Sequence, residues 1–393
     1  MLSRHTPPHL GTLILLSAIA VITLNMFLPS LPAMTEALDT SASIMALAVS
    51  GYMLMSAVLQ LIMGPVSDRL GRRPVLLAAL ALYTVSSIGC VFAQDVRVFL
   101  AFRMMQGVVI AGTILSAAVI RDQFPARDAA SKMGTIAASM ALAPMLGPML
   151  GGVLETTIGW RMIFALYAVF GALALALVWA DLGETRRIAA RAVNRRDYAA
   201  LLRSSPFWAY VLCQAFSVGG FYIFISGIPF VASHSYGLSP ALVGVALGSI
   251  TAGFMLGAAI TARLVTRFGL ARLIFAGRGI PTLGLASGLV ATGLGFMHPL
   301  VLFAATLTVG LGNGLTLPNA NAGALSVRPD LAGTAAGLTG ALSIAIGAGL
   351  TWITALVVDR QPTPGALLSL MLGCTLLSLI AAFVATRHDQ GHA

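Results

Sequence analysis

The stretch "GPVSDRLGRR", Gly64 to Arg73, separates two apolar runs that are each long enough to cross a bilayer. A chain that turns between antiparallel helices in so few residues needs a residue that tolerates a tight or left-handed backbone, and Gly71 provides it. Asp68 places an anion where it can meet a helix N-terminus or a basic side chain. A similar stretch, "ARLVTRFGLAR", Ala262 to Arg272, has Gly269 in the place of Gly71. The repetition indicates two similar halves.

The composition around this stretch is that of a membrane protein. Of 393 residues, 58% are hydrophobic and 9% are charged, whereas soluble domains average about 25% charged residues. A bilayer core needs about 20 apolar residues per helix. Such runs lie at about 10–36, 42–66, 74–93, 97–120, 130–154, 160–181, 207–233, 240–265, 272–296, 299–325, 332–357 and 364–386. The predicted fold is all-α, with twelve transmembrane helices in two pseudo-symmetric six-helix bundles.

The longest polar interruption, "GETRRIAARAVNRRDYAALLRSSP", follows the sixth run. We therefore expect an N-terminal bundle over 1–182, a cytoplasmic linker over 183–206 and a C-terminal bundle over 207–393. Basic residues concentrate in this linker and in the loops on the same side of the membrane, namely Arg4, Arg69, Arg72, Arg73, Arg121, Arg127, Lys132, Arg186, Arg187, Arg191, Arg195, Arg196, Arg203, Arg263, Arg267, Arg272, Arg328 and Arg387. The opposite loops hold only Arg97, Arg161 and Arg360. The positive-inside rule then predicts that both termini are cytoplasmic.

This topology explains the formal net charge of +10 without a nucleic-acid partner. The expected partners are the lipid bilayer of a bacterial inner membrane and a small-molecule substrate, and the protein is expected to act as a monomer. The cysteines lie in apolar runs without metal-ligand spacing, and all thirteen acidic residues fall in loops or at helix ends. The sequence therefore predicts no metal, no cofactor and no enzyme activity. The repeated halves disfavour a channel, and a long extramembrane domain that would suit a receptor is missing.

The fifth run contains "APMLGPMLGG", Ala143 to Gly152. Ala143, Gly147 and Gly151 are spaced by four, so they form a smooth stripe on one helix face, against which another helix can pack closely. Pro148 removes a backbone donor and favours a bend.

The fourth run contains "RMMQG", Arg103 to Gly107. An arginine inside a membrane span usually marks a pathway or a buried partner, although snorkelling to the interface is the alternative. Arg278 lies only six residues from the expected start of its run, so we expect that side chain to snorkel.

These motifs together resemble the major facilitator superfamily, and within it the drug/proton antiporter branch with the Bcr/CflA-like chloramphenicol and florfenicol exporters. The resemblance implies that Asp68, Arg72 and Asp122 form a latch that holds one access state closed, and that Arg103 helps to couple protons and substrate. The alternatives are arginines that only set topology and a stripe that only packs. The gating residues that the resemblance implies are Gly64, Asp68, Arg69, Gly71, Arg72, Arg73, Arg121, Asp122, Gly147, Pro148, Gly151 and Gly152.

The first run departs from this subfamily. Its pattern in helix 1 is commonly "D-M-Y-L-P", whereas this chain reads "NMFLP", with Asn25 in the place of the acid. An amide cannot titrate, so a proton cannot be carried at this position. Arg103 then lacks its usual counter-charge, and an anionic or strongly polar substrate is one candidate to supply it. Edge acids such as Glu36, or His234, are the remaining candidates for proton coupling.

Polar and aromatic residues in the runs expected to line a cavity complete the candidate site. Together with Asn25 and Arg103, they are Tyr52, Gln60, Gln106, Gln214, Tyr222, Asn313, Asn319, Asn321 and Trp352. The tenth run, "GLGNGLTLPNANAG", is expected to be bent and partly hydrated around Pro318. The predicted function is export of small amphipathic compounds, of multidrug or phenicol type, with the proton gradient as possible energy source. The alternative is an uncoupled or exchange carrier for an endogenous metabolite such as a sugar or an organic anion.

Overall fold

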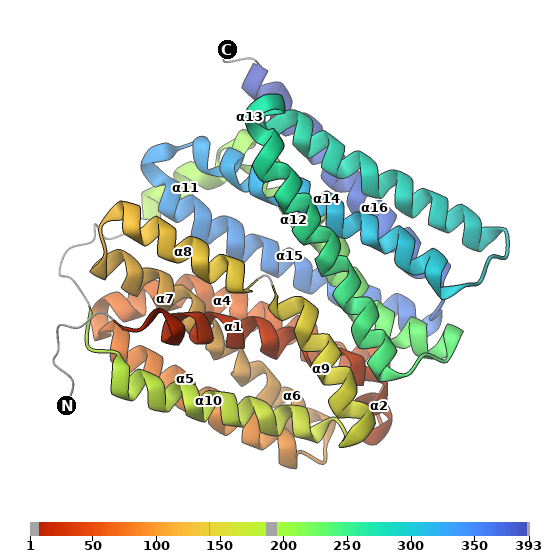
Figure 1. Cartoon of the computed structure of the whole chain (residues 1–393), viewed down its shortest axis with the longest axis horizontal. Coiled ribbons are helices and arrows are strands. Elements are labelled where there is room, and N and C mark those ends of the chain that lie inside the picture. Colours follow the sequence, from red (N-terminus) through yellow and green to blue (C-terminus); the bar gives the residue numbers. More distant parts are fainter. Residues whose placement is uncertain (1–7, 141, 186–194, 391–393) are drawn as a thin grey trace. The chain divides into compact units, whose positions relative to one another are not determined.

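The computed structural model describes residues 8–140, 142–185 and 195–390, nearly all of them helical. Eleven helical segments are long and apolar enough to cross a membrane. One of them, α13 (Pro240–Gly293), has 54 residues, and at about 1.5 Å per residue this is far longer than a bilayer core. Its backbone is non-helical at Gly269, where Figure 1 shows a sharp bend between two limbs. The limbs are separate crossings, so the twelve expected transmembrane helices are confirmed.

The chain divides into two compact units, Met1–Arg191 and Ala192–Ala393, and each is described by itself. The expected linker over 183–206 lies partly outside the described residues, which stop at 185 and resume at 195. Arg4, Arg186, Arg187 and Arg191 also lie outside them.

Several crossings of the N-terminal unit are interrupted. The first consists of α1 (Leu10–Asn25), the 3-10 helix η1 (Leu28–Ser30) and α2 (Leu31–Ala37), and the second of α3 (Ala42–Met45) and α4 (Leu47–Leu70). They are followed by α5 (Arg72–Phe92), by α6 (Val96–Met105) with η2 (Gln106–Val109) and α7 (Ile110–Gln123), and by α8 (Ala126–Met140), α9 (Ala143–Thr157) and α10 (Arg161–Asp181). The interruptions lie near the polar motifs of the sequence.

Local sequence accounts for the ends of these helices. Gly71 separates α4 from α5 with φ 101°, a backbone conformation that other residues rarely adopt. Asp95 caps α6, because its carboxylate accepts hydrogen bonds from the backbone of Arg97 at 2.8 Å and of Val98 at 3.3 Å. The predicted role of Gly71 is therefore confirmed, and Gly269, with φ 77°, repeats it in the C-terminal unit.

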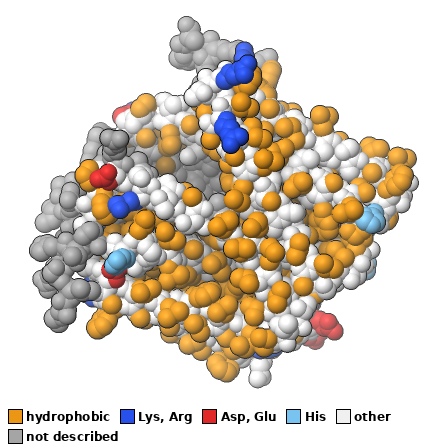
Figure 2. All heavy atoms as spheres, viewed as in Figure 1, with side chains coloured by type: hydrophobic (Ala, Val, Ile, Leu, Met, Phe, Trp, Pro, Cys, Tyr) orange, Lys and Arg blue, Asp and Glu red, His pale blue; other side chains and the backbone are white. Residues whose placement is uncertain are grey.

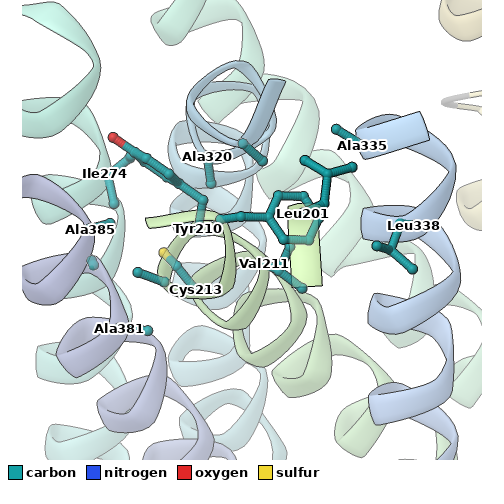
Figure 3. Close-up of a cluster of buried hydrophobic side chains, with 14 residues drawn as sticks. Leu201, Tyr210, Val211, Cys213, Ile274, Ala320, Ala335, Leu338, Ala381 and Ala385 are labelled. Carbon is teal, nitrogen blue, oxygen red and sulfur yellow. The ribbon is translucent and has the colours of Figure 1, made fainter. Parts of the chain in front are cut away.

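The C-terminal unit has longer and more regular helices. They are α11 (Arg195–Leu202), α12 (Ser205–Tyr236), α13, α14 (Pro299–Ser326) with η3 (Pro329–Leu331), α15 (Ala332–Arg360) and α16 (Pro364–Gln390). Ser204 and Ser239 cap α12 and α13 through their hydroxyls, and both helices have proline in the first turn. One core cluster joins α12 to its neighbours, with Tyr210 and Cys213 lying between Ile274, Ala320 and Ala381 (Figure 3).

Large apolar side chains remain exposed on the outer helix faces. Leu283 is 74% and Trp179 is 69% exposed. Figure 2 shows hydrophobic side chains spread over this face, with few charged ones between them. A soluble monomer rarely exposes so continuous an apolar surface, and a bilayer accounts for it. The chain is therefore a multi-pass membrane protein.

Candidate functional site

The first crossing breaks at the residue that departs from the family pattern. α1 ends at Asn25, and Pro29 cannot donate to the carbonyl of Asn25 in the next turn. The Asn25 side chain is only 3% exposed, and its Nδ2 donates to the carbonyl of Val21 at 2.8 Å. Its Oδ1 is buried without a hydrogen-bond partner. The break therefore carries an unsatisfied buried acceptor, the kind of group that a donor or water is expected to satisfy.

The glycine stripe of α9 packs against this break. A Cβ added at Gly147 would lie 3.8 Å from the Cβ of Asn25. A Cβ at Gly151 would overlap the carbonyl oxygen of Met26, so only glycine allows this approach. Ala143, Pro148 and Gly152 are buried on the same helix. The close packing predicted from the spacing of four is confirmed, and its partner is the broken segment of helix 1.

Arg103 lies inside the N-terminal unit and has no exposed surface. Its Nε donates to the carbonyl of Ala48 at 3.0 Å, one terminal nitrogen to Oε1 of Gln106 at 2.7 Å, and the other to the carbonyl of Thr23 at 2.9 Å. Thr23 is in the last turn of α1, where carbonyls lose their intrahelical donors. Arg103 therefore caps the C-terminal end of α1, and it connects its own helix, α6, to both α1 and α4.

Aromatic rings complete the surroundings of this guanidinium. Its central carbon lies 4.2 Å from the ring centroid of Phe27 and 4.4 Å from that of Tyr52, both within cation–π range. Gln106 is held in turn by a hydrogen bond from its Nε2 to Ser87 at 2.8 Å. All three nitrogens of Arg103 thus have acceptors in this structure, so the snorkelling alternative is wrong. That a substrate supplies its counter-charge stays a prediction.

The residues of the expected latch meet at the turn between α4 and α5. Arg72 pairs with Asp68 at 2.6 Å and with Asp122, at the end of α7, at 3.1 Å. Its remaining terminal nitrogen donates to the Ser67 hydroxyl. Arg69 and Arg121 are exposed. The structure thus brings Asp68, Arg72 and Asp122 together within the N-terminal unit, although a gating role is a matter of motion and stays a prediction.

Glu184 is a member of this cluster that the sequence did not indicate. Its carboxylate accepts hydrogen bonds from the backbone N–H groups of Arg72 at 2.9 Å and Arg73 at 3.3 Å. It thereby satisfies the unpaired donors at the start of α5, where an anion is favourable. A Cβ at Gly71 would strike this carboxylate. No spacing rule connects residues so far apart in the chain, so the sequence carried no signal for this contact.

The C-terminal unit also buries an arginine, contrary to the expectation from the sequence. Arg278 has no exposed surface, so the prediction that it snorkels is wrong. It donates to the Thr316 hydroxyl at 2.8 Å and to Oδ1 of Asn313 at 3.0 Å. The second limb of α13 starts directly after Gly269, which puts Arg278 about 13 Å along that limb. The sequence did contain a signal for this burial, because an arginine inside an apolar run usually has a buried partner.

The tenth crossing, α14, is continuous through Pro318. Proline leaves the Gly314 carbonyl without its helical donor, and the Thr261 hydroxyl donates to that carbonyl at 3.0 Å instead. Asn319, 1% exposed, donates to the carbonyl of Leu315 at 2.7 Å. A neighbouring helix therefore repairs the proline site, which explains why α14 does not break as helix 1 does.

The remaining candidates differ in exposure. Asn313 is buried and also accepts a hydrogen bond from Ser217 at 2.8 Å. Tyr52 is buried, and its hydroxyl donates to the carbonyl of Ala20 at 3.3 Å. The partly buried residues are Gln60, Gln214 and Tyr222, and the exposed ones are Asn321 and Trp352. That these side chains line one cavity stays a prediction.

Comparison with known proteins decides the family. The model of the Major Facilitator Superfamily matches residues 13–351. The chain belongs to this superfamily. Its members carry small molecules across membranes, so the chain is a transporter and not an enzyme.

Curated relatives match nearly the whole chain. A chloramphenicol resistance protein of Pseudomonas aeruginosa is 29% identical over 94% of this chain and 90% of its own length. A bicyclomycin resistance protein homolog of Haemophilus influenzae is 28% identical over 96% of both chains. The multidrug transporter MdfA of Yersinia pestis is 27% identical over 95% of this chain and 92% of its own. These names fit the drug/proton antiporter branch that the motifs resemble.

Solved structures support the fold. A bacterial homolog of the human lysosomal transporter Spinster matches with a TM-score of 0.78 at 16% identity, over 97% of this chain and 96% of its own. A D-xylose–proton symporter matches with a TM-score of 0.74 at 16% identity, over 95% of this chain and 94% of its own. At this identity the likeness concerns the fold alone.

Proposed function

We propose that this chain is a secondary transporter that exports small amphipathic compounds, drugs of the phenicol type among them, by alternating access. The similarity along nearly the whole chain to relatives named for chloramphenicol resistance, bicyclomycin resistance and multidrug transport carries this proposal. The tight contact of the α9 stripe with the broken helix 1 supports it, because the glycines of α9 put no side chain of their own between the two segments.

The proposal includes sidedness and assembly. We place both termini and the turn between α4 and α5 on the cytoplasmic side of a bacterial inner membrane. The loops on the same side as these segments hold most of the basic residues, and such loops are cytoplasmic by the positive-inside rule. The chain acts as a monomer in this proposal. The cluster of Asp68, Arg72 and Asp122 is then a cytoplasmic latch, and it holds α4, α5 and α7 together in one access state.

We also propose that export is proton-linked, through a group other than residue 25. Asn25 has no titratable proton, and this same observation favours the second candidate, an uncoupled or exchange carrier for a sugar or an organic anion. The two candidates differ in their response to a pH gradient and in their substrates.

Purified protein in proteoliposomes tests both candidates. Vesicles loaded with unlabelled chloramphenicol are expected to accumulate external labelled chloramphenicol by exchange, and an imposed pH gradient is expected to accelerate its net movement. Vesicles without protein control for diffusion of the drug through lipid. Exchange of a sugar or an organic acid, with none of chloramphenicol, would support the carrier for an endogenous metabolite instead.

A further inference from the structure

The stripe of α9 ends in an acid. Ala143, Gly147 and Gly151 recur every four residues, and the next position in this series is Glu155. Residues four apart lie on the same helix face, so Glu155 continues the face that packs against the break of helix 1. Gly147 lies beside Asn25, and Glu155 is eight residues further, about 12 Å along the helix.

Glu155 differs from the other acids that the structure describes. It is half-buried, and its Oε2 is buried without a hydrogen-bond partner. The Ser30 hydroxyl, in η1, is also buried without a partner. α9 packs against η1, so the two unsatisfied groups lie on neighbouring elements. Among described carboxylates, Glu155 alone has an unsatisfied buried oxygen, whereas Asp68, Asp122 and Asp181 have donors.

The elements that pack against α9 leave this carboxylate without a counter-charge. α1 and η1 contain no titratable side chain. On α10 the candidates are Arg161, Tyr167 and Asp181. Arg161 instead donates to the Ala93 carbonyl at 3.2 Å and lies 4.2 Å from the Trp160 ring.

The other two groups on α10 are also engaged elsewhere. Tyr167 donates to the Ile22 carbonyl at 3.3 Å, and Asp181 accepts a hydrogen bond from Thr12 at 2.6 Å. The charged residues of α8 are Arg127, Asp128 and Lys132. They lie in the first half of that helix, and most of α9 follows them in the chain before Glu155 is reached. In the part of the chain that the structure describes, no ion pair involves Glu155.

We propose that Glu155, with Ser30 as its partner, is the proton-binding site of this transporter and takes over the function that the acid of helix 1 has in the resembled subfamily. This inference rests on the proposed export function and names its coupling group. Proton binding converts the carboxylate into a neutral acid, which removes an unpaired charge from a partly buried site. The neutral acid also supplies an O–H donor toward Ser30.

The geometry implies that protons and substrate are coupled indirectly. α9 packs against η1, and its Gly147 and Gly151 lie against Asn25 and Met26 at the end of α1. A change at the acid therefore alters the same helix contact that shapes the break. In one access state the carboxylate takes a proton from the aqueous phase on its side. After the contact between α9 and helix 1 rearranges, the acid releases that proton, and the carboxylate forms again.

Proteoliposome transport of labelled chloramphenicol tests the site with matched variants. E155Q keeps the size and hydrogen-bonding capacity of the side chain but cannot titrate. We expect E155Q to exchange chloramphenicol at nearly the wild-type rate, while the acceleration by a pH gradient falls by about tenfold. E155D is expected to restore most of that acceleration. D39N is the control, because Asp39 is an exposed acid in the turn after α2 of the same unit, and it should respond like wild type.

The outcomes separate this inference from the proposed function. Gradient-driven transport that persists in E155Q, or is lost in D39N instead, overturns the proton site. Wild-type exchange that ignores the pH gradient also overturns it while the export function stands. A wild type that exchanges no chloramphenicol overturns the proposed function, and this inference with it. A transport-independent check is the pH titration of the infrared carboxylic-acid band, in which E155Q should remove a component that D39N leaves in place.

Discussion

Among the described residues, each unit of this transporter has one arginine with no exposed surface, Arg103 or Arg278, and the two are satisfied differently. Arg103 donates to three acceptors on α1, α4 and η2, and two aromatic rings cover its faces. Arg278 donates to two acceptors, Asn313 and Thr316, both on α14, and one terminal nitrogen is buried without a partner. Arg103 thus connects several helices of its unit, whereas Arg278 connects α13 to a single neighbour. A buried arginine matters for stability in proportion to the acceptors that depend on it.

The turns at Gly71 and Gly269 show the same contrast. Both glycines have positive φ. The turn at Gly71 is surrounded by Asp68, Arg72 and Glu184, whereas a Cβ at Gly269 would meet no atom within 4 Å. Within the described residues, no ion pair forms at the second turn. The repeat therefore keeps the backbone of the turn, but only the N-terminal unit builds an ionic cluster on it.

The largest expected effect is that of Arg103→Ala. The substitution leaves the carbonyls of Thr23 and Ala48 without their donor and empties a buried site, so we expect a loss of about 3 kcal/mol in the free energy of unfolding. Thermal unfolding in detergent, followed by tryptophan fluorescence, measures it. Arg97→Ala, an exposed arginine on the same helix, is the control. An unfolding temperature of Arg103→Ala equal to that of this control would refute the role assigned to Arg103.

A smaller effect is expected for Gly71→Ala, with Gly269→Ala as its matched partner. Both substitutions put a Cβ on a backbone conformation that is essentially restricted to glycine, at a cost of about 1 kcal/mol each. Only the Cβ at residue 71 also strikes Glu184, so we expect about 2 kcal/mol for Gly71→Ala. Urea or thermal unfolding of the two variants in the same detergent gives the difference. Equal losses would mean that the Glu184 cap adds nothing to the turn.

Arg278→Met is expected to change stability by about 1 kcal/mol or less, because replacing a partly satisfied buried charge by an apolar side chain removes its desolvation cost. Asn313 keeps its hydrogen bond from Ser217. The same unfolding measurement, run beside Arg103→Met, sharpens the contrast between the units. A loss at residue 278 as large as that at residue 103 would contradict it.

The smallest effect is expected for Asn25→Asp, compared with Asn319→Asp. Each amide donates its Nδ2 to the carbonyl four residues earlier, but Asn25 also has a buried acceptor at the break of helix 1. An aspartate at residue 25 is neutral at low pH and becomes a buried carboxylate as the pH rises. Because burial disfavours that charge, we expect chloramphenicol exchange to fall by about twofold as pH rises. Asn319→Asp should leave the pH profile of exchange unchanged. Identical profiles for the two variants would remove the special status of residue 25.

Much of the fold follows from the sequence. The twelve crossings, the turn glycines at 71 and 269, and the stripe on α9 are local patterns, because a bilayer selects apolar runs and a helix repeats every 3.6 residues. The cluster at Asp68, Arg72 and Asp122 was also predicted, although through resemblance. The candidate site was predicted less well: the sequence assigned Arg278 to the interface, yet it is buried.

Only the tertiary structure decided which groups meet. The carbonyl of Thr23 lies 80 residues from Arg103 in the chain, and Glu184 lies 112 residues from Arg72. Backbone carbonyls and N–H groups occur at every position, so no residue type marks the ones that a distant side chain will find. The sequence by itself determined which segments cross the membrane and that residue 25 cannot carry a proton. Packing of those segments determined that each nitrogen of Arg103 has an acceptor and that the buried oxygen of Glu155 has no hydrogen-bond partner, because such partners are neighbours that only the folded chain brings together.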